Sequence, residues 1–289
     1  MAIYNLGSVN IDHVYRITHL PEPGETLAST SFNSGLGGKG ANQSIAIAKA
    51  GGDVFHIGAI GNDGGWLVDQ MRGAGVDTRH LAVLDVPTGH AIINVDDAAE
   101  NTIVLYSGAN FSLTEALVND ALSTASTDDW LLVQNETNLC FYAATLAKSK
   151  GMRVAYAAAP FDAGVAVAMM PVTDLLAVNH IEAAQLSDAM GADVADLPVP
   201  QVLITYGAKG ASLRSGAEVV FVEAYKVDPV DTTGAGDTFL GYLMAATDMG
   251  RPVKDALTFA TAASAIQVTR TGAGSAIPAA NEVEAFINR

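Results

Sequence analysis

Residues 231–237, Asp-Thr-Thr-Gly-Ala-Gly-Asp, place a carboxylate directly after a glycine-rich turn that opens an expected helix. Backbone N–H groups at such a helix start attract a phosphate or a developing oxyanion, because the helix dipole is positive there. Asp237 would lie beside that anion as a candidate base. A carboxylate weakens simple phosphate binding, so its presence indicates chemistry at the bound anion. An ordinary N-terminal cap with an acid in the first turn is the alternative.

Residues 35–40, Gly-Leu-Gly-Gly-Lys-Gly, form a second glycine-rich segment ahead of an expected helix. They fit the dinucleotide pattern Gly-x-Gly-x-x-Gly, which belongs in the first strand–helix turn, with an acid at the tip of the next strand. Here the expected first strand, residues 3–9, lies much earlier, and the strand expected at 54–60 ends without an acid. A dinucleotide-dependent oxidoreductase is therefore a distant alternative.

The same segment is better interpreted as a substrate cradle. Gly38 lets a ligand approach the backbone, Lys39 offers a cation, and Asn42 follows in the first turn of the helix. Asn10 and Asp12 come after the first strand, and ligands of open α/β sheets bind at the carboxyl ends of strands. Amide and carboxylate groups beside glycine turns suit a polyol, although Asn10 and Asp12 would also fit a simple turn.

Composition argues against several classes of protein. The net charge of −16 argues against general binding to nucleic acid or to an anionic membrane. No apolar run approaches the roughly 18 residues that span a membrane, and the first residues do not resemble a signal peptide, so we expect a cytoplasmic protein. Cys140 is the single cysteine, which rules out an internal disulfide. The motif Gly-x-x-x-x-Gly-Lys-Ser/Thr is absent, so a phosphate site must be built in another way.

The elements that would position these groups alternate between strand and helix. Apolar runs bounded by glycine or polar residues predict strands at 3–9, 54–60, 130–134, 153–157, 175–178 and 202–206. Helical periodicity and end signals predict helices at 40–50, 66–74, 113–123, 139–149, 181–190, 235–247, 253–268 and 280–287. This alternation predicts an α/β fold with a mostly parallel sheet that is covered on both faces.

Residues 14–32 and 88–106 break this alternation, since they are strand-rich and lack helical periodicity. Strands are expected at 14–17, 26–32, 90–95 and 102–106, the last two as a hairpin. Together these segments predict a small sheet, separate from the main one, that would form a lid over the strand ends.

Three segments, in the same order along the chain, resemble the signatures of the ribokinase-like (PfkB) sugar kinases. They are residues 7–12 (Gly-Ser-Val-Asn-Ile-Asp), 37–43 (Gly-Gly-Lys-Gly-Ala-Asn-Gln) and 231–237. The resemblance spans essentially the whole chain. It implies a single three-layer α/β/α domain over residues 1–289, with a mostly parallel central sheet and a small β lid. The lid would be discontinuous and formed by about residues 13–34 and 88–107.

Within the family, segments between residues 88 and 110 and residues 268–273 are similar to members that phosphorylate D-ribose. The resemblance implies transfer of the γ-phosphate of ATP to the 5-hydroxyl of D-ribose, with Asp237 as base. The anion hole would be formed by Gly234, Ala235 and Gly236. The sugar would be held by Asn10, Asp12, Gly38, Lys39, Asn42, Glu136 and Asp237. The nucleotide would be bound by Asn179, Thr205, Gly207, Lys209 and Gly210. We expect Asp237 to stay ionised at neutral pH if the helix N-terminus lowers its pKa.

The resemblance also implies two kinds of metal ion. Glu182 matches the family's Asn-x-x-Glu segment and would help to place Mg²⁺, largely through water. A monovalent cation, commonly K⁺, would lie beside the anion hole, with partly backbone ligands from Asp231, Thr233, Gln267, Arg270 and Gly272. One position departs from the family pattern: where a serine is familiar, this chain has Ala276, with Ser275 one residue early. This leaves the last cation ligand open, and K⁺ dependence could be weaker.

A strand-rich lid with exposed edges invites pairing with a second copy, so we expect a homodimer through the lid. The expected ligands are a sugar and ATP, without nucleic acid or membrane partners. The nearest alternative is a kinase of the same fold for another sugar or a nucleoside, because the sequence does not define the pocket. A sugar sensor without catalytic activity is an alternative of a different class. Asp237 argues against the sensor, since pure binding does not require a base.

Overall fold

The computed structural model describes residues 1–98 and 100–288. Its largest element is a sheet with the strand order β13-β12-β11-β10-β9-β8-β1-β4-β5. In chain order these strands are β1 Ala2–Leu6, β4 Asp53–Gly61, β5 Asp77–Leu84, β8 Trp130–Gln134, β9 Arg153–Ala157, β10 Leu175–Asn179, β11 Gln201–Thr205, β12 Ala211–Ser215 and β13 Glu218–Val222. Neighbouring strands are parallel except in the pairs β11–β12 and β12–β13. The expectation of a mostly parallel sheet is confirmed.

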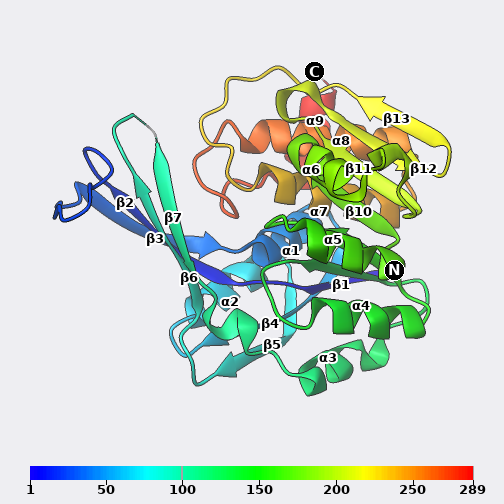
Figure 1. Cartoon of the computed structure of the whole chain (residues 1–289), viewed down its shortest axis with the longest axis horizontal. Helices are drawn as coiled ribbons and strands as arrows, with labels where there is room; N and C mark the ends of the chain where they lie inside the picture. Colours follow the sequence, from blue (N-terminus) through cyan, green and yellow to red (C-terminus); the bar gives the residue numbers. More distant parts are fainter. Residues whose placement is uncertain (99, 289) are drawn as a thin grey trace.

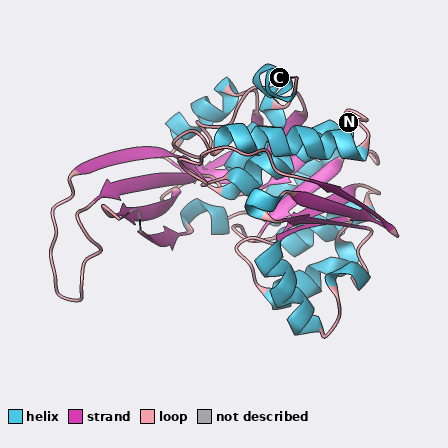
Figure 2. Cartoon of the chain, turned by 90° about the horizontal axis from the view of Figure 1, so that it is seen from above, coloured by secondary structure: helices cyan, strands magenta, loops and turns pink. Residues whose placement is uncertain are grey.

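Helices cover both faces of this sheet (Figure 2). One face carries α1 Lys39–Lys49, α2 Gly65–Gly73, α7 Ala235–Asp248, α8 Val253–Gln267 and α9 Ala280–Ile287. The opposite face carries α3 Glu115–Ala121, α4 Cys140–Ser149, α5 Ala163–Met169 and α6 His180–Met190. Each layer buries its apolar side chains in its own hydrophobic core against the sheet. The three-layer α/β/α architecture is the one expected from the sequence.

Local sequence explains why many of these elements form where predicted. The central strands are covered on both faces, so they consist of continuous apolar runs. Strand β8 is buried at every residue, and β9 at all but its first. Helix α6 begins with a capping box, in which the Asn179 side chain accepts the N–H of Glu182 and the Glu182 carboxylate accepts the N–H of Asn179.

A second, smaller sheet has the strand order β3-β2-β6-β7. Its strands are β2 Asn10–Arg16, β3 Ser31–Gly37, β6 Gly89–Val95 and β7 Asn101–Tyr106. Strands β6 and β7 are the antiparallel hairpin expected from the sequence, while β2 pairs antiparallel with β3 and parallel with β6. Figure 1 shows this sheet projecting from the body, on the left of the view.

The boundaries of three predicted strands, at 3–9, 14–17 and 26–32, were wrong. The first strand ends at Leu6, and Asn10 and Asp12 belong to β2 of the small sheet rather than to the tip of β1. The chain leaves the main sheet here because the N–H of Val9 donates to the side chain of Asn110, at 2.9 Å, instead of to a neighbouring strand. The strand expected at 26–32 begins only at Ser31.

Four elements were not predicted from the sequence: β5, β12, β13 and α5. Strand β5 lies at one edge of the large sheet, and β12 and β13 form a hairpin at the other, so polar residues interrupt their apolar pattern. Helix α5 carries valines at alternate positions, as a strand would, but Asp162 caps it by accepting the N–H of Val165 at 2.9 Å. In the described parts of the chain, no helix is both long and apolar enough to cross a membrane.

Candidate active site

The carboxyl edge of the parallel strands brings the sugar-binding candidates together. Strand β1 is the switch point of the sheet, since it lies between β4 and β8, and ligands of open α/β sheets bind at such points. Glu136, just beyond β8, accepts the Ser8 hydroxyl at 2.5 Å and the N–H of Lys39 at 3.0 Å. This carboxylate therefore joins the ends of β1 and β8 to the start of α1.

Helices α1 and α7 cross at Gly241, where no side chain would fit. A Cβ at Gly241 would lie 2.5 Å from the Cβ of Ala46 and 2.9 Å from the carbonyl oxygen of Gln43. Asp237 lies one turn earlier on the same face of α7, because residues four apart are neighbours on a helix. The close approach at Gly241 therefore places the Asp237 carboxylate against α1.

Asp237 is buried and accepts hydrogen bonds from two side chains of α1. Nε2 of Gln43 donates to Oδ1 at 2.8 Å, and Nδ2 of Asn42 donates to Oδ2 at 3.4 Å. Burial raises the pKa of Asp237 to about 6, although Lys39 and the two amides act to lower it. The pKa of Asp237 is thus not lowered, because loss of hydration on burial disfavours the charged form. A carboxylate with this pKa is still largely ionised at pH 7 and is well matched to proton transfer.

Lys39 is the cation among these carboxylates. Burial lowers the pKa of Lys39, but the negative charges of Asp237, Glu136 and Glu182 outweigh burial and raise the pKa overall. Lys39 therefore stays charged at neutral pH. It supplies local positive charge to the site of a strongly acidic chain.

The glycine turn before α7 has the geometry of an anion site. Gly234 is the N-cap of α7 with a φ of +74°, a left-handed conformation that is strained for residues with a Cβ. The N–H of Ala235 donates to the carbonyl of Thr232 at 3.2 Å, so it is already engaged. The N–H groups of Gly236 and Asp237 lie in the first turn, where a helix offers no internal acceptor. Such N–H groups can bind an anion.

Asp231 ties this turn to the loop that follows α8. Its Oδ1 accepts the N–H of Thr233 and its Oδ2 the N–H of Gly272, both at 2.9 Å. Burial raises the pKa of Asp231, but these two hydrogen bonds outweigh burial, so the pKa lies below its ordinary value. Gln267 is fully buried, and its Nε2 donates to the carbonyl of Thr233 at 2.9 Å. The residues predicted to hold a monovalent cation thus lie together.

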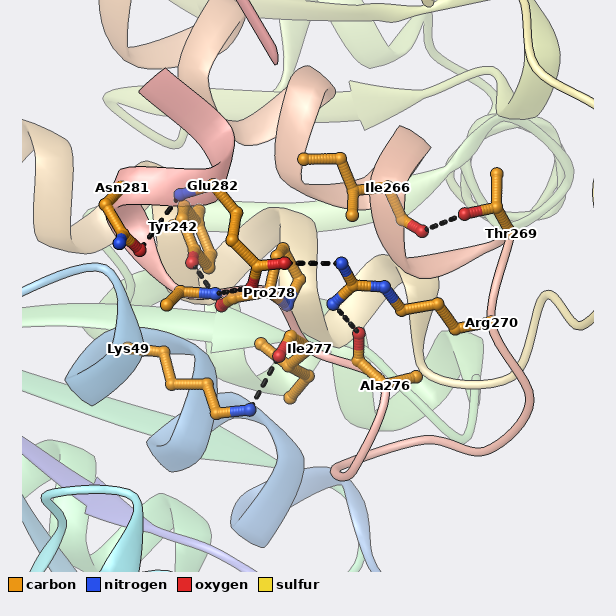
Figure 3. Close-up of polar contacts among 11 residues, drawn as sticks. Lys49, Tyr242, Ile266, Thr269, Arg270, Ala276, Ile277, Pro278, Asn281 and Glu282 are labelled. Carbon is orange, nitrogen blue, oxygen red and sulfur yellow. Dashed lines mark hydrogen bonds and ion pairs between the residues drawn. The ribbon is translucent and has the colours of Figure 1, made fainter. Parts of the chain in front are cut away.

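Two cationic side chains, Arg270 and Lys49, hold the loop between α8 and α9. The Arg270 guanidinium pairs with Glu282 at 2.6 Å and donates to the carbonyl of Ala276 at 3.5 Å (Figure 3). Nζ of Lys49 donates to the carbonyl of Ile277 at 2.6 Å. The Arg270 side chain is thus engaged with Glu282 and Ala276, so only its backbone carbonyl remains as a candidate cation ligand.

Asn10 and Asp12 differ in how fully their side chains are paired. Nδ2 of Asn110 donates to Oδ1 of Asn10 at 2.7 Å, which leaves the amide hydrogens of Asn10 for a ligand. The Asp12 carboxylate has no hydrogen-bond partner among residues 1–98 and 100–288. Burial, and then the negative charge of Glu136, raise the pKa of Asp12 to about 6. A desolvated carboxylate beside a second carboxylate is costly, which is typical of a binding site.

A cavity of about 430 Å³ adjoins the glycine turn. It is lined by Thr205, Gly207 and Gly210 of the predicted nucleotide site and by Ala235 and Gly236 of the turn. Its volume falls within the usual range of small-molecule pockets, about 300–1,000 Å³. The cavity therefore meets the candidate anion site, as a nucleotide whose phosphates reach the turn would require.

The remaining nucleotide and metal candidates are Lys209, Asn179 and Glu182. Lys209 and Asn179 are not among the described residues that line this cavity, although Asn179 pairs with Thr205 across β10 and β11. Oε2 of Glu182 caps α6, and no hydrogen bond occupies its Oε1 in the described structure. Glu182 thus has one oxygen available for water or a metal ion.

Sequence reasoning gave no role to three buried residues at the site: Gln43, Asn110 and Gln134. Asn110 fixes Asn10, as described above, while Gln134 donates to Oε1 of Gln43 at 2.7 Å. Gln43 was visible in the glycine segment, directly after Asn42. No local signal connects Asn110 or Gln134 with residues so far away in the sequence.

An α/β sheet with a helix-borne carboxylate between a polar cradle and a nucleotide-sized cavity defines the class of small-molecule phosphotransferases. The model of the pfkB family of carbohydrate kinases matches residues 3–280. The ribokinase of Haemophilus influenzae is 36% identical over 297 residues, covering 98% of this chain and 97% of that protein. The chain therefore belongs to the pfkB family of carbohydrate kinases.

Solved structures agree in fold. The crystal structure of a ribokinase from Thermotoga maritima has a TM-score of 0.89 and 34% identity, covering 100% of both chains. The ribokinase of Arabidopsis thaliana complexed with ribose and ATP has a TM-score of 0.86 and 26% identity, covering 100% of this chain and 98% of that one. The chain is thus a sugar kinase with the ribokinase-like α/β fold.

Proposed function

We propose that this chain transfers the γ-phosphoryl group of ATP to the 5-hydroxyl of D-ribose. The observation that carries the proposal is the position of Asp237, which lies between the cradle residue Asn42 and the open N–H groups at the start of α7. The names of the relatives, which include a ribokinase solved with ribose and ATP, support ribose as the sugar.

The sugar would be held on the β1–β2 side of the site by Asn10, Asp12, Gly38, Lys39, Asn42 and Glu136. We place the nucleotide in the cavity beside Thr205, Gly207 and Gly210, with Asn179 and Lys209 at its border. The small sheet would act as a lid on the sugar, because β2 carries Asn10 and Asp12 themselves. A cytoplasmic location stays a prediction.

In this arrangement Asp237 accepts the proton of the 5-hydroxyl as that oxygen forms a bond to the γ-phosphorus of ATP. The bond between this phosphorus and the β–γ bridging oxygen breaks, and ADP leaves with its electron pair. The N–H groups of Gly236 and Asp237 receive the negative charge that develops on the phosphoryl oxygens, and Gly234 and Ala235 form the turn that presents them. Phosphoryl transfer depends mainly on positioning and charge stabilisation, which these fixed groups provide.

Two metal ions fit the residues present. Mg²⁺ commonly binds through one or two carboxylates, water and substrate phosphates, and Glu182 has a free oxygen for such a role. For a monovalent cation, the buried Oε1 of Gln267 lacks a partner among the described residues, while its Nε2 holds the carbonyl of Thr233, whose N–H in turn donates to the carboxylate of Asp231. Bound there, K⁺ would add positive charge behind the anion hole.

A substrate panel tests this function directly. We expect ADP release with Mg-ATP and K⁺ to be strong on ribose and weak on 2-deoxyribose, fructose, tagatose, adenosine and a no-sugar blank. Strong turnover on another acceptor would keep the mechanism and replace the substrate. Ribose binding by calorimetry without turnover on any acceptor would favour the sensor. Repeating the ribose assay in Na⁺ or Tris tests the cation site, and equal rates in all three would contradict activation by K⁺.

We also expect a homodimer formed through the small sheet. Strand β7 is an edge strand whose residues are all exposed, including Val104 at 64%. An apolar edge of this kind favours pairing with a second copy. Light scattering at micromolar concentration should give twice the 29.8 kDa of one chain.

Substitution Val104→Glu should shift the dimer toward the monomer, because it places a charge on the apolar edge. Val219→Glu is the matched control, since Val219 is 61% exposed on β13, the edge strand of the large sheet. A monomeric wild-type protein, or equal effects of the two substitutions, would refute the dimer through the lid.

A further inference from the structure

Asp237 accepts its shorter side-chain hydrogen bond from Gln43, a residue that is only 2% exposed. The Gln43 bond, at 2.8 Å, has ordinary length, whereas the Asn42 bond, at 3.4 Å, is long for an N–H donor. Asn42 also faces the proposed sugar site, where its donor would be needed by the ligand. Gln43 is therefore the fixed partner of the base.

The orientation of the Gln43 amide follows from a chain of hydrogen bonds that begins at a backbone carbonyl. Nδ2 of Asn5 donates to the carbonyl of Gly40 at 2.8 Å, and a carbonyl can only accept. Oδ1 of Asn5 therefore faces Gln134, whose Nε2 donates to it at 2.8 Å and also to Oε1 of Gln43 at 2.7 Å. This leaves Nε2 of Gln43 to point at Asp237.

The opposite orientation would bring an amide oxygen against the carboxylate. Three carboxamides, from β1, β8 and α1, thus present one donor to the base. The network has a cost, because Oε1 of Gln134 is buried without a partner in the described structure. An unpaired buried oxygen destabilises a fold, because it loses its hydration without gaining a hydrogen bond. An apolar residue at 134 would avoid this cost but would free the Gln43 amide to rotate.

We propose that Gln43 is a positioning residue that orients the Asp237 carboxylate, and that Gln134 and Asn5 lock the direction of its amide. The proposal rests on the role of Asp237 as base. The side-chain amide N–H of Gln43 stabilises the charged carboxylate of Asp237 and fixes its Oδ1. Oδ2 is then left to face Asn42 and the acceptor hydroxyl. The other charges that face Asp237 are Lys39 from α1 and Glu136 from the loop after β8.

The test is Gln43→Met, which keeps the length of the side chain and removes the donor. We expect kcat on the best acceptor to fall about tenfold with KM within about twofold. The acid limb of the kcat profile should move to higher pH by about one unit, because a lost hydrogen bond to the charged form raises the pKa of a carboxyl. Gln70→Met, on the exposed face of α2, is the matched control and should leave both unchanged.

Gln134→Met provides a second, independent test and decides the matter if Gln43→Met does not fold. It should move the acid limb in the same direction by a smaller amount, and the double variant should not exceed Gln43→Met. If either folded variant kept the pH profile and the kcat of the wild-type protein, the proposal would be overturned. The substituted glutamine would then serve only to pack the interior. If Asp237→Asn keeps full turnover, the proposed base itself fails. If Asp237→Asn is inactive while Gln43→Met is normal, only the positioning role fails.

Discussion

Asp237→Asn should lower kcat by roughly 10²–10⁴-fold, the usual contribution of a general base, while ribose binding stays nearly intact. The substitution keeps the shape of the side chain and its contact with Gln43, so the loss falls on proton transfer. In the wild-type enzyme, kcat/KM should fall as the pH drops below about 6, because protonation of Asp237 in the free enzyme removes the base. Steady-state kinetics from pH 5 to 9 and calorimetry with ribose measure both effects.

Asp69→Asn is the matched control, because Asp69 lies on α2 with its side chain exposed and its carboxylate 3.8 Å from the Arg72 guanidinium. It should leave kcat and the pH profile unchanged. Near-normal turnover by Asp237→Asn at neutral pH would refute the assignment of Asp237 as base. A loss of ribose affinity equal to the loss of kcat would indicate instead that the carboxylate serves mainly to bind the sugar.

Asp12→Ala should raise the KM for ribose roughly 10- to 150-fold, since a hydrogen bond to a charged group contributes about 1.5–3 kcal/mol. The same substitution should stabilise the protein without ligand. The folded pKa of Asp12 is about 6, above its ordinary value of 3.8, so the folded state holds the proton more tightly than the unfolded state. Stability therefore falls as the pH rises from about 4 to 6, and the full cost is present above pH 6.

The expected gain in the free energy of unfolding is roughly 1–3 kcal/mol at pH 8, since one pKa unit corresponds to about 1.4 kcal/mol. Urea unfolding at pH 8 and pH 5 measures it, and the gain should shrink at the lower pH. Asp85→Ala, in an exposed loop, is the control and should change neither quantity. A destabilised Asp12→Ala with an unchanged KM would show that this carboxylate supports the fold rather than the substrate.

Local signals in the sequence were sufficient for the central elements. An apolar run such as β8, or a cap residue such as Asn179, determines the structure of its own short segment. The sheet and most helices could therefore be predicted. The edges of the sheet could not, because edge strands such as β5 and β13 have little apolar pattern. The turn out of β1 also escaped prediction, since it depends on Asn110, which lies about a hundred residues away.

In the candidate site, too, some features follow from local sequence and others depend on distant residues. Asp237 and the glycine turn could be selected as candidates from one short segment, and in the structure Asp237 lies in the first turn of α7, directly after that turn. The pKa of Asp237 could not be predicted, because it depends on how tightly α7 packs on α1 at Gly241. The partner Gln43 was visible beside Asn42, but its orientation depends on Gln134 and Asn5. Such contacts become visible only when distant segments are placed together.

The crossing of α1 and α7 at Gly241 joins two parts of the sequence to which we assign different substrates. On the proposed assignment, the acceptor is recognised by residues before position 140 and the phosphoryl donor by residues after 178. Asp237 of α7 contacts α1 and so lies between the two parts. Such an arrangement is modular: changes on β2 or β6 can retune acceptor choice while the donor half stays untouched. A family with one donor and many acceptors could diversify on this scaffold by altering its first half alone.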